Sequence, residues 1–260
     1  MHQFVIQREA RHRLREGYGI RVFSKPELLR AWLEKEGLTL EERAHLITDA
    51  GQYPPEFNMA WDNAEFFIHM PFASTIDATG VYKRNEESLV FQARFRAGGR
   101  ITQVLFMADV NADTIYNIVE ITKDHHNEDR LKWAIMKISH HCSYKSLNCA
   151  EKGETKTTPN DHVKWLMEEQ GEANGIMVST SDPVPDVDTI QPPHFQAENY
   201  YLDVKRKKFG KWYVTQEYPT KENPKPLEIE ITQTGYSVLQ KVSSALGASL
   251  STQSPRVGGE

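Results

Sequence analysis

Two apolar runs that end in metal-binding side chains constrain the fold of this chain more than any other feature. Residues 102–109 (TQVLFMAD) end in Asp109, and residues 133–139 (WAIMKIS) run directly into His140 and His141. Each run has the length and the β-branched or aromatic content of a buried strand. A segment with helical spacing separates them, so the chain is expected to fold as an α/β protein with these side chains on adjacent strand ends.

The flanking segments complete the expected order of elements. Residues 1–20 are polar and irregular in pattern. Ser24 and Pro26 predict the start of a helix that ends at Gly37, and the capping box from Thr39 predicts a second helix that ends at Gly51. Gly98-Gly99 predicts a tight turn between two strands. The further strands are expected at residues 64–70, 88–95, 175–181, 211–216 and 226–232, and the further helices at residues 113–121, 161–170 and after Pro193.

The composition and net charge of the chain argue against several classes of protein. The 260 residues carry a net charge of -5, so no whole-chain basic excess holds nucleic acid by counterion release. No apolar run approaches the ~20 residues that span a bilayer. The first residues, MHQFVIQREARHRLREG, lack the apolar region of a signal peptide. With only Cys142 and Cys149 present, a disulfide scaffold is not expected, and the predicted location is a reducing cytoplasm with no membrane partner.

A carboxylate and imidazoles on neighbouring strand ends form a ligand set that suits zinc, manganese or iron. A bridging carboxylate lets two metal ions share an activated hydroxide, and strand ends supply the rigidity that this geometry needs. The alternative is structural, because an aspartate after a strand is commonly a turn residue and adjacent histidines are commonly surface residues. The order of Asp109, a helix and the His140-His141 pair favours the metal site.

The same run of residues resembles a known family. NEESLVF, VLFMAD and KISHHCS are similar to successive motifs in the second half of metallo-β-lactamase-fold hydrolases of the competence-protein type. GIMVSTS, PPH, KWYVTQ and LEIEITQTGYSV resemble the later strands and loop of that family, so the likeness spans residues 64–240. It implies half of an αββα sandwich and a site with two zinc ions, or manganese or iron in their place.

The resemblance also implies roles for individual residues. Asp109 matches the bridging metal ligand, and either His140 or His141 matches the last metal ligand. His194 matches a histidine that faces the site and contacts substrate or transfers a proton. Four further positions match the family without a direct role in metal binding. Asn85 and Ser88 match a structural motif that precedes a strand, and Ser143 matches the serine after the paired histidines. His69 matches a histidine at a strand end that is usually not a ligand.

The sequence departs from the family at its principal metal motif. H-x-H-x-D-H is expected before residue 60, yet no such motif is present. Ala108 and Cys142 stand where the family has glycines, and Cys142 adds a soft ligand candidate. Three explanations stay open: a fragment of a longer protein, a separate chain that supplies the missing half, or a degenerate relative. The expected domains are a helical spacer (1–60), the family-like half (61–243) and a disordered tail (244–260).

Two other motifs are weighed and set aside. Asp124-His125-His126 is similar to the motif of the Asp-His-His phosphoesterases, but it lies in a charged loop rather than at the end of a buried strand. The basic run at residues 205–212 (KRKKFGKW) has the composition of a phosphate contact. An exposed helix end and hairpin is the preferred explanation of this run.

Two hypotheses for function follow. In the first, the chain is a metal-dependent hydrolase that acts on phosphoester or nucleic-acid-like substrates, with Asp109 and the His140-His141 pair as ligands and His194 assisting. In the second, it is a non-catalytic subunit or pseudoenzyme that serves as a protein-interaction module. Half of a sandwich exposes apolar surface, so such a chain is expected to pair with a partner.

Overall fold

The computed structural model describes residues 2–24, 27–72 and 88–239. Asn85 and the predicted disordered tail at residues 244–260 lie outside these ranges. The helices are α1 (His2–Glu16), α2 (Glu27–Lys35), α3 (Leu40–Arg43), α4 (Ala112–Asp124), α5 (Asp161–Glu168) and α6 (Phe195–Lys208). The strands are β1 (Val22–Phe23), β2 (Ile47–Thr48), β3 (Ala64–Met70), β4 (Val90–Ala97), β5 (Arg100–Phe106), β6 (Trp133–Lys137), β7 (Gly171–Ser179), β8 (Lys211–Val214), β9 (Ile229–Thr232) and β10 (Gly235–Val238).

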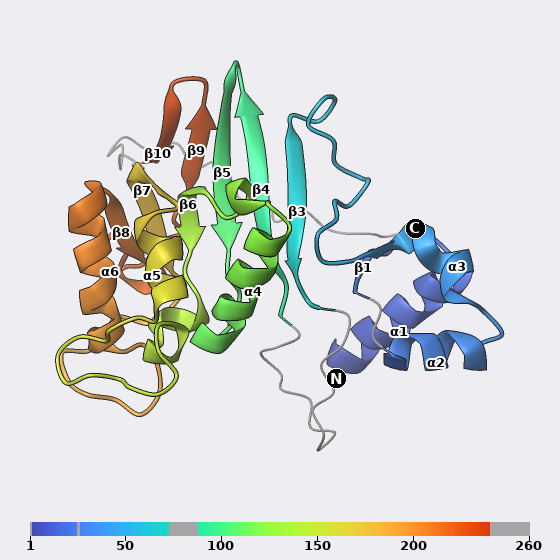
Figure 1. Ribbon diagram of the computed structural model, residues 1–260, viewed down its shortest axis with the longest axis horizontal. Coiled ribbons are helices and arrows are strands. Elements are labelled where there is room, and N and C mark those ends of the chain that lie inside the picture. The colour runs from blue at the N-terminus through green and yellow to red at the C-terminus, as the bar shows by residue number, and fades with distance from the viewer. Residues whose placement is uncertain (1, 25–26, 73–87, 240–260) are drawn as a thin grey trace, which may run out of the picture.

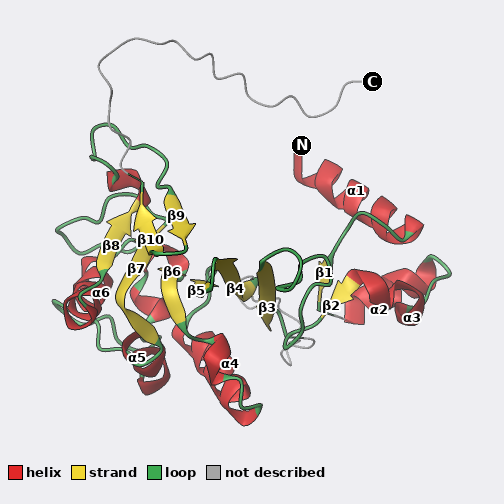
Figure 2. Ribbon diagram, turned by 90° about the horizontal axis from the view of Figure 1, so that it is seen from above, coloured by secondary structure: helices red, strands yellow, loops and turns green. Residues whose placement is uncertain are grey.

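A six-stranded mixed sheet organises the described part of the chain, in the order β3-β4-β5-β6-β7-β8. β3, β4 and β5 pair antiparallel, whereas β5, β6, β7 and β8 run parallel to one another. Helices α4, α5 and α6 cover one face of this sheet (Figures 1 and 2). The α/β class expected from the sequence is therefore confirmed.

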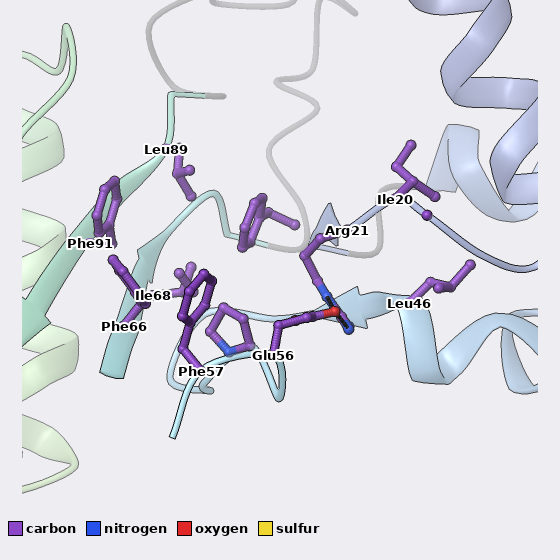
Figure 3. A pocket seen from close by; sticks show the side chains of 12 residues that line it. Ile20, Arg21, Leu46, Glu56, Phe57, Phe66, Ile68, Leu89 and Phe91 are labelled. Carbon is purple, nitrogen blue, oxygen red and sulfur yellow. Dashed lines mark hydrogen bonds and ion pairs between the residues drawn. The ribbon is translucent and has the colours of Figure 1, made fainter. Parts of the chain in front are cut away.

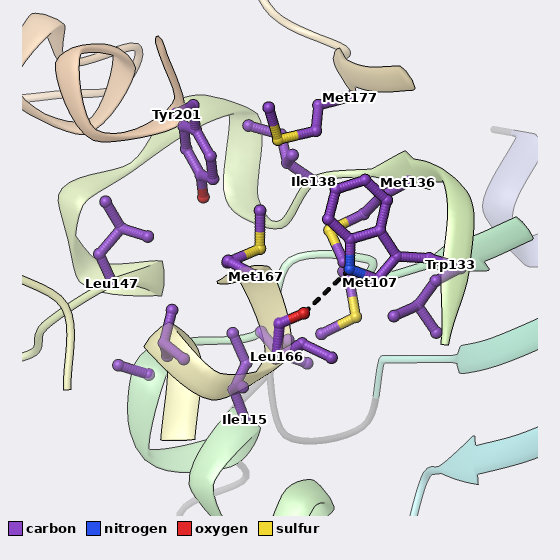
Figure 4. Packing of buried hydrophobic residues seen from close by; sticks show 14 of the residues in the cluster. Met107, Ile115, Trp133, Met136, Ile138, Leu147, Leu166, Met167, Met177 and Tyr201 are labelled. Carbon is purple, nitrogen blue, oxygen red and sulfur yellow. Dashed lines mark hydrogen bonds between the residues drawn. The ribbon is translucent and has the colours of Figure 1, made fainter. Parts of the chain in front are cut away.

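The helix-covered face holds the larger core. Trp133 is 1% exposed, and its indole Nε1 donates a hydrogen bond of 2.9 Å to the Leu166 carbonyl of α5. This bond satisfies the one polar atom of a large apolar side chain, as buried tryptophans require. Figure 4 shows the ring surrounded by methionine and aliphatic side chains from β6, β7 and α5.

The opposite face of the sheet is rich in aromatic residues. Phe66, Phe91, Phe95 and Phe106 are half-buried there. The β9–β10 hairpin covers part of this face (Figure 2), through side chains such as Ile229 and Ile231. The other half of an αββα sandwich is not present among the described residues.

The N-terminal residues form a small unit of their own beyond the β3 edge of the sheet (Figure 1). Its helices α1, α2 and α3 and the parallel pair β1–β2 enclose a separate core around Leu14, Leu33 and Leu46. None of the helices that the structure describes is both long and apolar enough to cross a membrane.

Three expectations about local structure are wrong. Residues 2–16 form helix α1 rather than irregular chain, with an Arg13–Glu9 ion pair one turn apart. The capping box at Thr39 is present, but its α-helix ends at Arg43; the next three residues form a 3-10 turn (Ala44–Leu46), and the chain then enters β2, which pairs with β1. Strand β5 ends at Phe106, so Asp109 lies in the loop beyond it.

The strand at residues 64–70 is confirmed, and it places His69 in the interior, away from the strand ends discussed below. The His69 ring is 4% exposed, and its Nε2 lies 2.9 Å from the Arg130 carbonyl, to which it donates. Burial lowers the pKa of His69 from 6.5 to about 4, because water no longer solvates the charged ring.

This burial predicts a loss of stability in acid. Between pH 6.5 and 4 the unfolded chain binds a proton at His69 that the folded chain does not, so folding weakens as pH falls through this window. The expected loss from this group is about 3 kcal/mol. Urea unfolding at pH 7 and pH 4 measures it against His69→Gln, which keeps an amide donor near Arg130. Equal losses in both proteins would contradict the assignment.

Candidate functional site

The register of the parallel strands brings four loops to one edge of the sheet. Phe106 of β5 pairs with Lys137 of β6, Lys137 pairs with Val178 of β7, and Val178 pairs with Tyr213 of β8. The residues that follow each strand therefore emerge side by side at the carboxyl ends, where α/β proteins commonly place their binding sites. Asp109, the His140-His141 pair and Thr180 all belong to these loops.

Asp109 is held beside the cationic side chain of Lys137. Its Oδ1 lies 3.7 Å from the Lys137 Nζ, and Lys137 also donates a 2.9 Å hydrogen bond to the Ala108 carbonyl. Burial lowers the pKa of Lys137, while the neighbouring Asp109 opposes that shift. The carboxylate itself is 42% exposed, so it remains open to solvent and to ligands.

His141 is the histidine that meets Asp109. It lies in a short turn, His140–Cys142, in which all three residues have a left-handed backbone, with φ between 50° and 62°. Its Nδ1 is 2.6 Å from the Thr180 carbonyl and its Nε2 is 3.3 Å from the Asp109 Oδ2. A carbonyl can only accept, so Nδ1 carries the proton and the lone pair of a neutral ring is on Nε2, toward Asp109.

His140 occupies a different environment. Its backbone N–H donates to the Ala108 carbonyl at 3.0 Å, which ties the histidine turn to the loop after β5. Its ring is half-buried, and its Nδ1 has no hydrogen-bond partner among the residues that the structure describes. Burial lowers the pKa of His140, and Asp109 opposes this shift.

His194 lies immediately before helix α6 and is 2% exposed. The backbone N–H of Tyr144 points at its Nδ1 at 3.4 Å, and the Tyr144 ring packs edge-on against the imidazole. Burial lowers the pKa of His194, and Lys152 lowers it further. The contacts of His194 are with Cys142 and Tyr144 rather than with Asp109.

Cys142 does not face the metal-binding pair. Its side chain is fully buried in the core of the helix-covered face, and burial raises the pKa of its thiol well above the ordinary value. A soft metal ligand is a thiolate, so the sequence-based suggestion of Cys142 as a ligand is not supported by its position. Ser143 is also buried, and its Oγ accepts from the Lys145 backbone.

A shallow pocket of about 290 Å³ opens beside His141. Its other walls come from the loops after β7 and β8 and from the Pro192-Pro193 segment. Lys137 pairs with Asp109 and Lys152 pairs with Asp188, while Asp182 lines the pocket, so charges of both signs surround this edge.

The Asp109 Oδ2 and His141 Nε2 atoms are placed to bind one metal ion, but the described residues do not supply a full set of ligands. Two ligands at about 2.1 Å from a tetrahedral zinc ion are about 3.4 Å apart, close to the separation of Asp109 Oδ2 and His141 Nε2. The Nδ1 bond to Thr180 is the kind of contact that orients metal-binding histidines. Within residues 2–24, 27–72 and 88–239, however, no group of three or more His, Cys, Asp or Glu side chains could hold a metal.

The sequence pointed to Asp109, His140 and His141 but missed Lys137 and Thr180. Lys137 had a signal, because it is the one charged residue in an otherwise apolar strand. Thr180 had none, since it acts through its backbone carbonyl. Of the motifs set aside, His125 and His126 are exposed at the end of α4, and the basic run lies at the C-terminal end of α6, whereas the site is near the beginning of that helix.

Comparison with known proteins adds no identification. No family model matches the sequence, and no curated protein matches it.

Backbone strain next to Asp109 predicts a stabilising substitution. Ala108 has φ of 42°, a conformation that costs a residue with a Cβ roughly 1 kcal/mol. Ala108→Gly is therefore expected to raise the free energy of unfolding by about 1 kcal/mol in chemical denaturation. Ala134→Gly, within regular strand β6, is the matched control and should destabilise the protein. A destabilised Ala108→Gly protein would show that this turn is not strained as described.

Proposed function

We propose that this chain carries part of the active site of a metal-dependent hydrolase of the metallo-β-lactamase type. In this proposal Asp109 is the bridging ligand and His141, rather than His140, is the histidine ligand. The observation that carries it is the 3.3 Å approach of His141 Nε2 to the Asp109 carboxylate, with Nδ1 fixed by the Thr180 carbonyl. The chemistry that zinc supplies in such hydrolases is activation of bound water.

Backbone geometry supports the family resemblance at the two positions where the sequence departs from it. Ala108 and Cys142 stand where the family has glycines, and both have a left-handed backbone, with φ of 42° and 62°. Glycine adopts this region without strain. The two turns thus keep a glycine-type conformation without the glycine, which is the kind of strain found at functional sites.

The ligands still needed come, in this proposal, from a segment or chain outside these 260 residues. Two protein ligands are fewer than the three or four of known zinc sites, so the site requires a complement. The half-buried aromatic face of the sheet offers a surface on which a protein carrying those ligands could pack. Manganese or iron would suit the same oxygen and nitrogen donors.

The proposed substrate class, an anionic phosphoester or nucleic-acid-like molecule, comes from the family resemblance. Lys145 is a cationic side chain close enough to act electrostatically on His140. Lys137 holds the Asp109 carboxylate in place. The sequence-based role of His194 in proton transfer stays a prediction, because its contacts in the structure are with Cys142 and Tyr144.

Because the described residues supply two metal-binding side chains here rather than three, a second function, as a protein-interaction module, is also supported. If the pair Asp109–His141 only stabilises the loops, the chain serves as an interaction module whose aromatic face binds another protein. The absence of a three-ligand group from the described residues is the observation that supports this alternative.

Zinc titration distinguishes the metal-dependent hydrolase from the interaction module. Isothermal titration of the 260-residue chain should detect one site whose affinity falls at least about tenfold in Asp109→Ala and in His141→Ala. The double substitution His125→Ala/His126→Ala is the matched control, because it removes another adjacent histidine pair, which is exposed at the end of α4. It should leave zinc affinity unchanged.

Turnover tests the hydrolase directly. Together with the complementing segment, zinc- or manganese-loaded protein should hydrolyse bis(p-nitrophenyl) phosphate, and Asp109→Ala should return the rate to background. Zinc binding without hydrolysis, even after the complementing protein is supplied, would favour the interaction module. Zinc affinity that does not depend on Asp109 and His141 would contradict the proposed site.

A further inference from the structure

A cavity of about 530 Å³ lies between the N-terminal unit and the aromatic face of the sheet. Figure 3 shows side chains from both parts of the chain pointing into it, with Phe57, Phe66 and Phe91 on one side and Ile20 and Leu46 on the other. This volume falls within the range of about 300–1,000 Å³ that is typical of small-molecule sites.

The cavity lies between two hydrophobic clusters, the N-terminal core and the aromatic face of the sheet. Leu46 belongs to the N-terminal core, whereas Phe66 and Phe91 belong to the cluster on the aromatic face. Hydrogen bonds fix the connecting loop against β3, from the Gly51 N–H to the Ile68 carbonyl at 2.7 Å and from the Ile68 N–H to the Gln52 carbonyl at 3.0 Å. These contacts preform the cavity, which lowers the ordering cost of binding.

The charged side chains that line the cavity lie together at one place on its wall. Arg21 and Glu56 are the only charged residues in the described lining. The Arg21 Nε donates to Glu56 Oε1 at 3.0 Å, an Nη2 bond reaches the same oxygen, and Nη1 reaches the buried Thr48 hydroxyl at 3.4 Å. A guanidinium has five N–H groups, so two donors remain after these three bonds.

The charge balance decides which ligand fits. Glu56 already neutralises Arg21, so a charged ligand would find no free counter-ion on the described wall. An uncharged acceptor, such as a ketone or amide oxygen, can take a remaining Arg21 N–H and needs no counter-ion. Aromatic rings on the wall favour a flat or aromatic body, because ring pairs contribute beyond the area that they bury.

We propose that this cavity is a binding site for a small uncharged molecule with an aromatic or similarly flat apolar body and one hydrogen-bond acceptor, which meets Arg21. The site is separate from the edge of the sheet that carries Asp109 and His141, and it does not depend on metal binding there.

Fluorescence titration of the full chain with two naphthalene dyes tests the proposal. The uncharged naphthyl ketone prodan should bind saturably at one site with a blue shift, and more tightly than the anionic dye ANS. Leu89→Trp, which fills the cavity, should weaken prodan binding at least about tenfold. Phe57→Ser is a second wall variant whose parent side chain is 48% exposed, so it changes binding with little risk to the fold.

Arg21→Met gives an independent readout of the acceptor contact. It should weaken prodan binding by about tenfold and shift the bound emission further to the blue, because the ketone loses its hydrogen bond. Ile190→Ser is the matched control, since it removes an exposed apolar side chain (92% exposed) elsewhere and should change nothing.

Three outcomes would overturn the proposal. The first is prodan binding that is equal in the parent chain, Leu89→Trp and Phe57→Ser. The second is tighter binding of ANS than of prodan, which would exclude an uncharged ligand. The third is a dimer in sedimentation that Leu89→Trp abolishes, because the cavity would then be occupied by a second copy of the chain.

Discussion

Parallel pairing of β5, β6, β7 and β8 is the constraint on which the rest of this structure depends. It places the carboxyl ends of four strands at one edge, so that residues far apart in sequence meet in the loops beyond them. The hydrogen bond from the His140 N–H to the Ala108 carbonyl extends this pairing past the strands themselves. Because of it, His141 lies against Asp109 with its ring fixed by a carbonyl from the loop after β7.

The two faces of the sheet have different roles. Helices α4, α5 and α6 cover one face with a core that contains the fully buried Trp133 and Cys142. The other face carries phenylalanines that remain half-buried between the β9–β10 hairpin and the N-terminal unit. This asymmetry places the cavity beside Arg21 away from the helix-covered core.

Much of the architecture follows from sequence pattern alone. The strand at residues 64–70, the Gly98-Gly99 turn and the capping box at Thr39 have strong local signals, and each is present. Helix α1 was missed because it is polar: among residues 5–16, whose burial the structure describes, Leu14 alone is buried, so the helix lacks an apolar stripe. Strand β2 was missed because two residues pair with β1 only through tertiary contact.

The residues of the candidate site were predictable from the sequence, but the way they are arranged was not. Asp109 and the paired histidines were identified by their place after apolar strands. The distinction between His140 and His141 depends on the Thr180 carbonyl, which has no side-chain signature. The cavity beside Arg21 joins residues from two separate cores, and no local pattern in the sequence indicates such a junction.

The central claim is that Asp109 and His141 together bind a metal ion through Oδ2 and Nε2. Anomalous scattering at the zinc edge, from crystals of the chain grown with zinc, tests it most directly. The account predicts a peak about 2.1 Å from both atoms, with the His141 Nδ1 still bonded to Thr180. A peak at His140 instead, or no peak between Asp109 and His141, would contradict it.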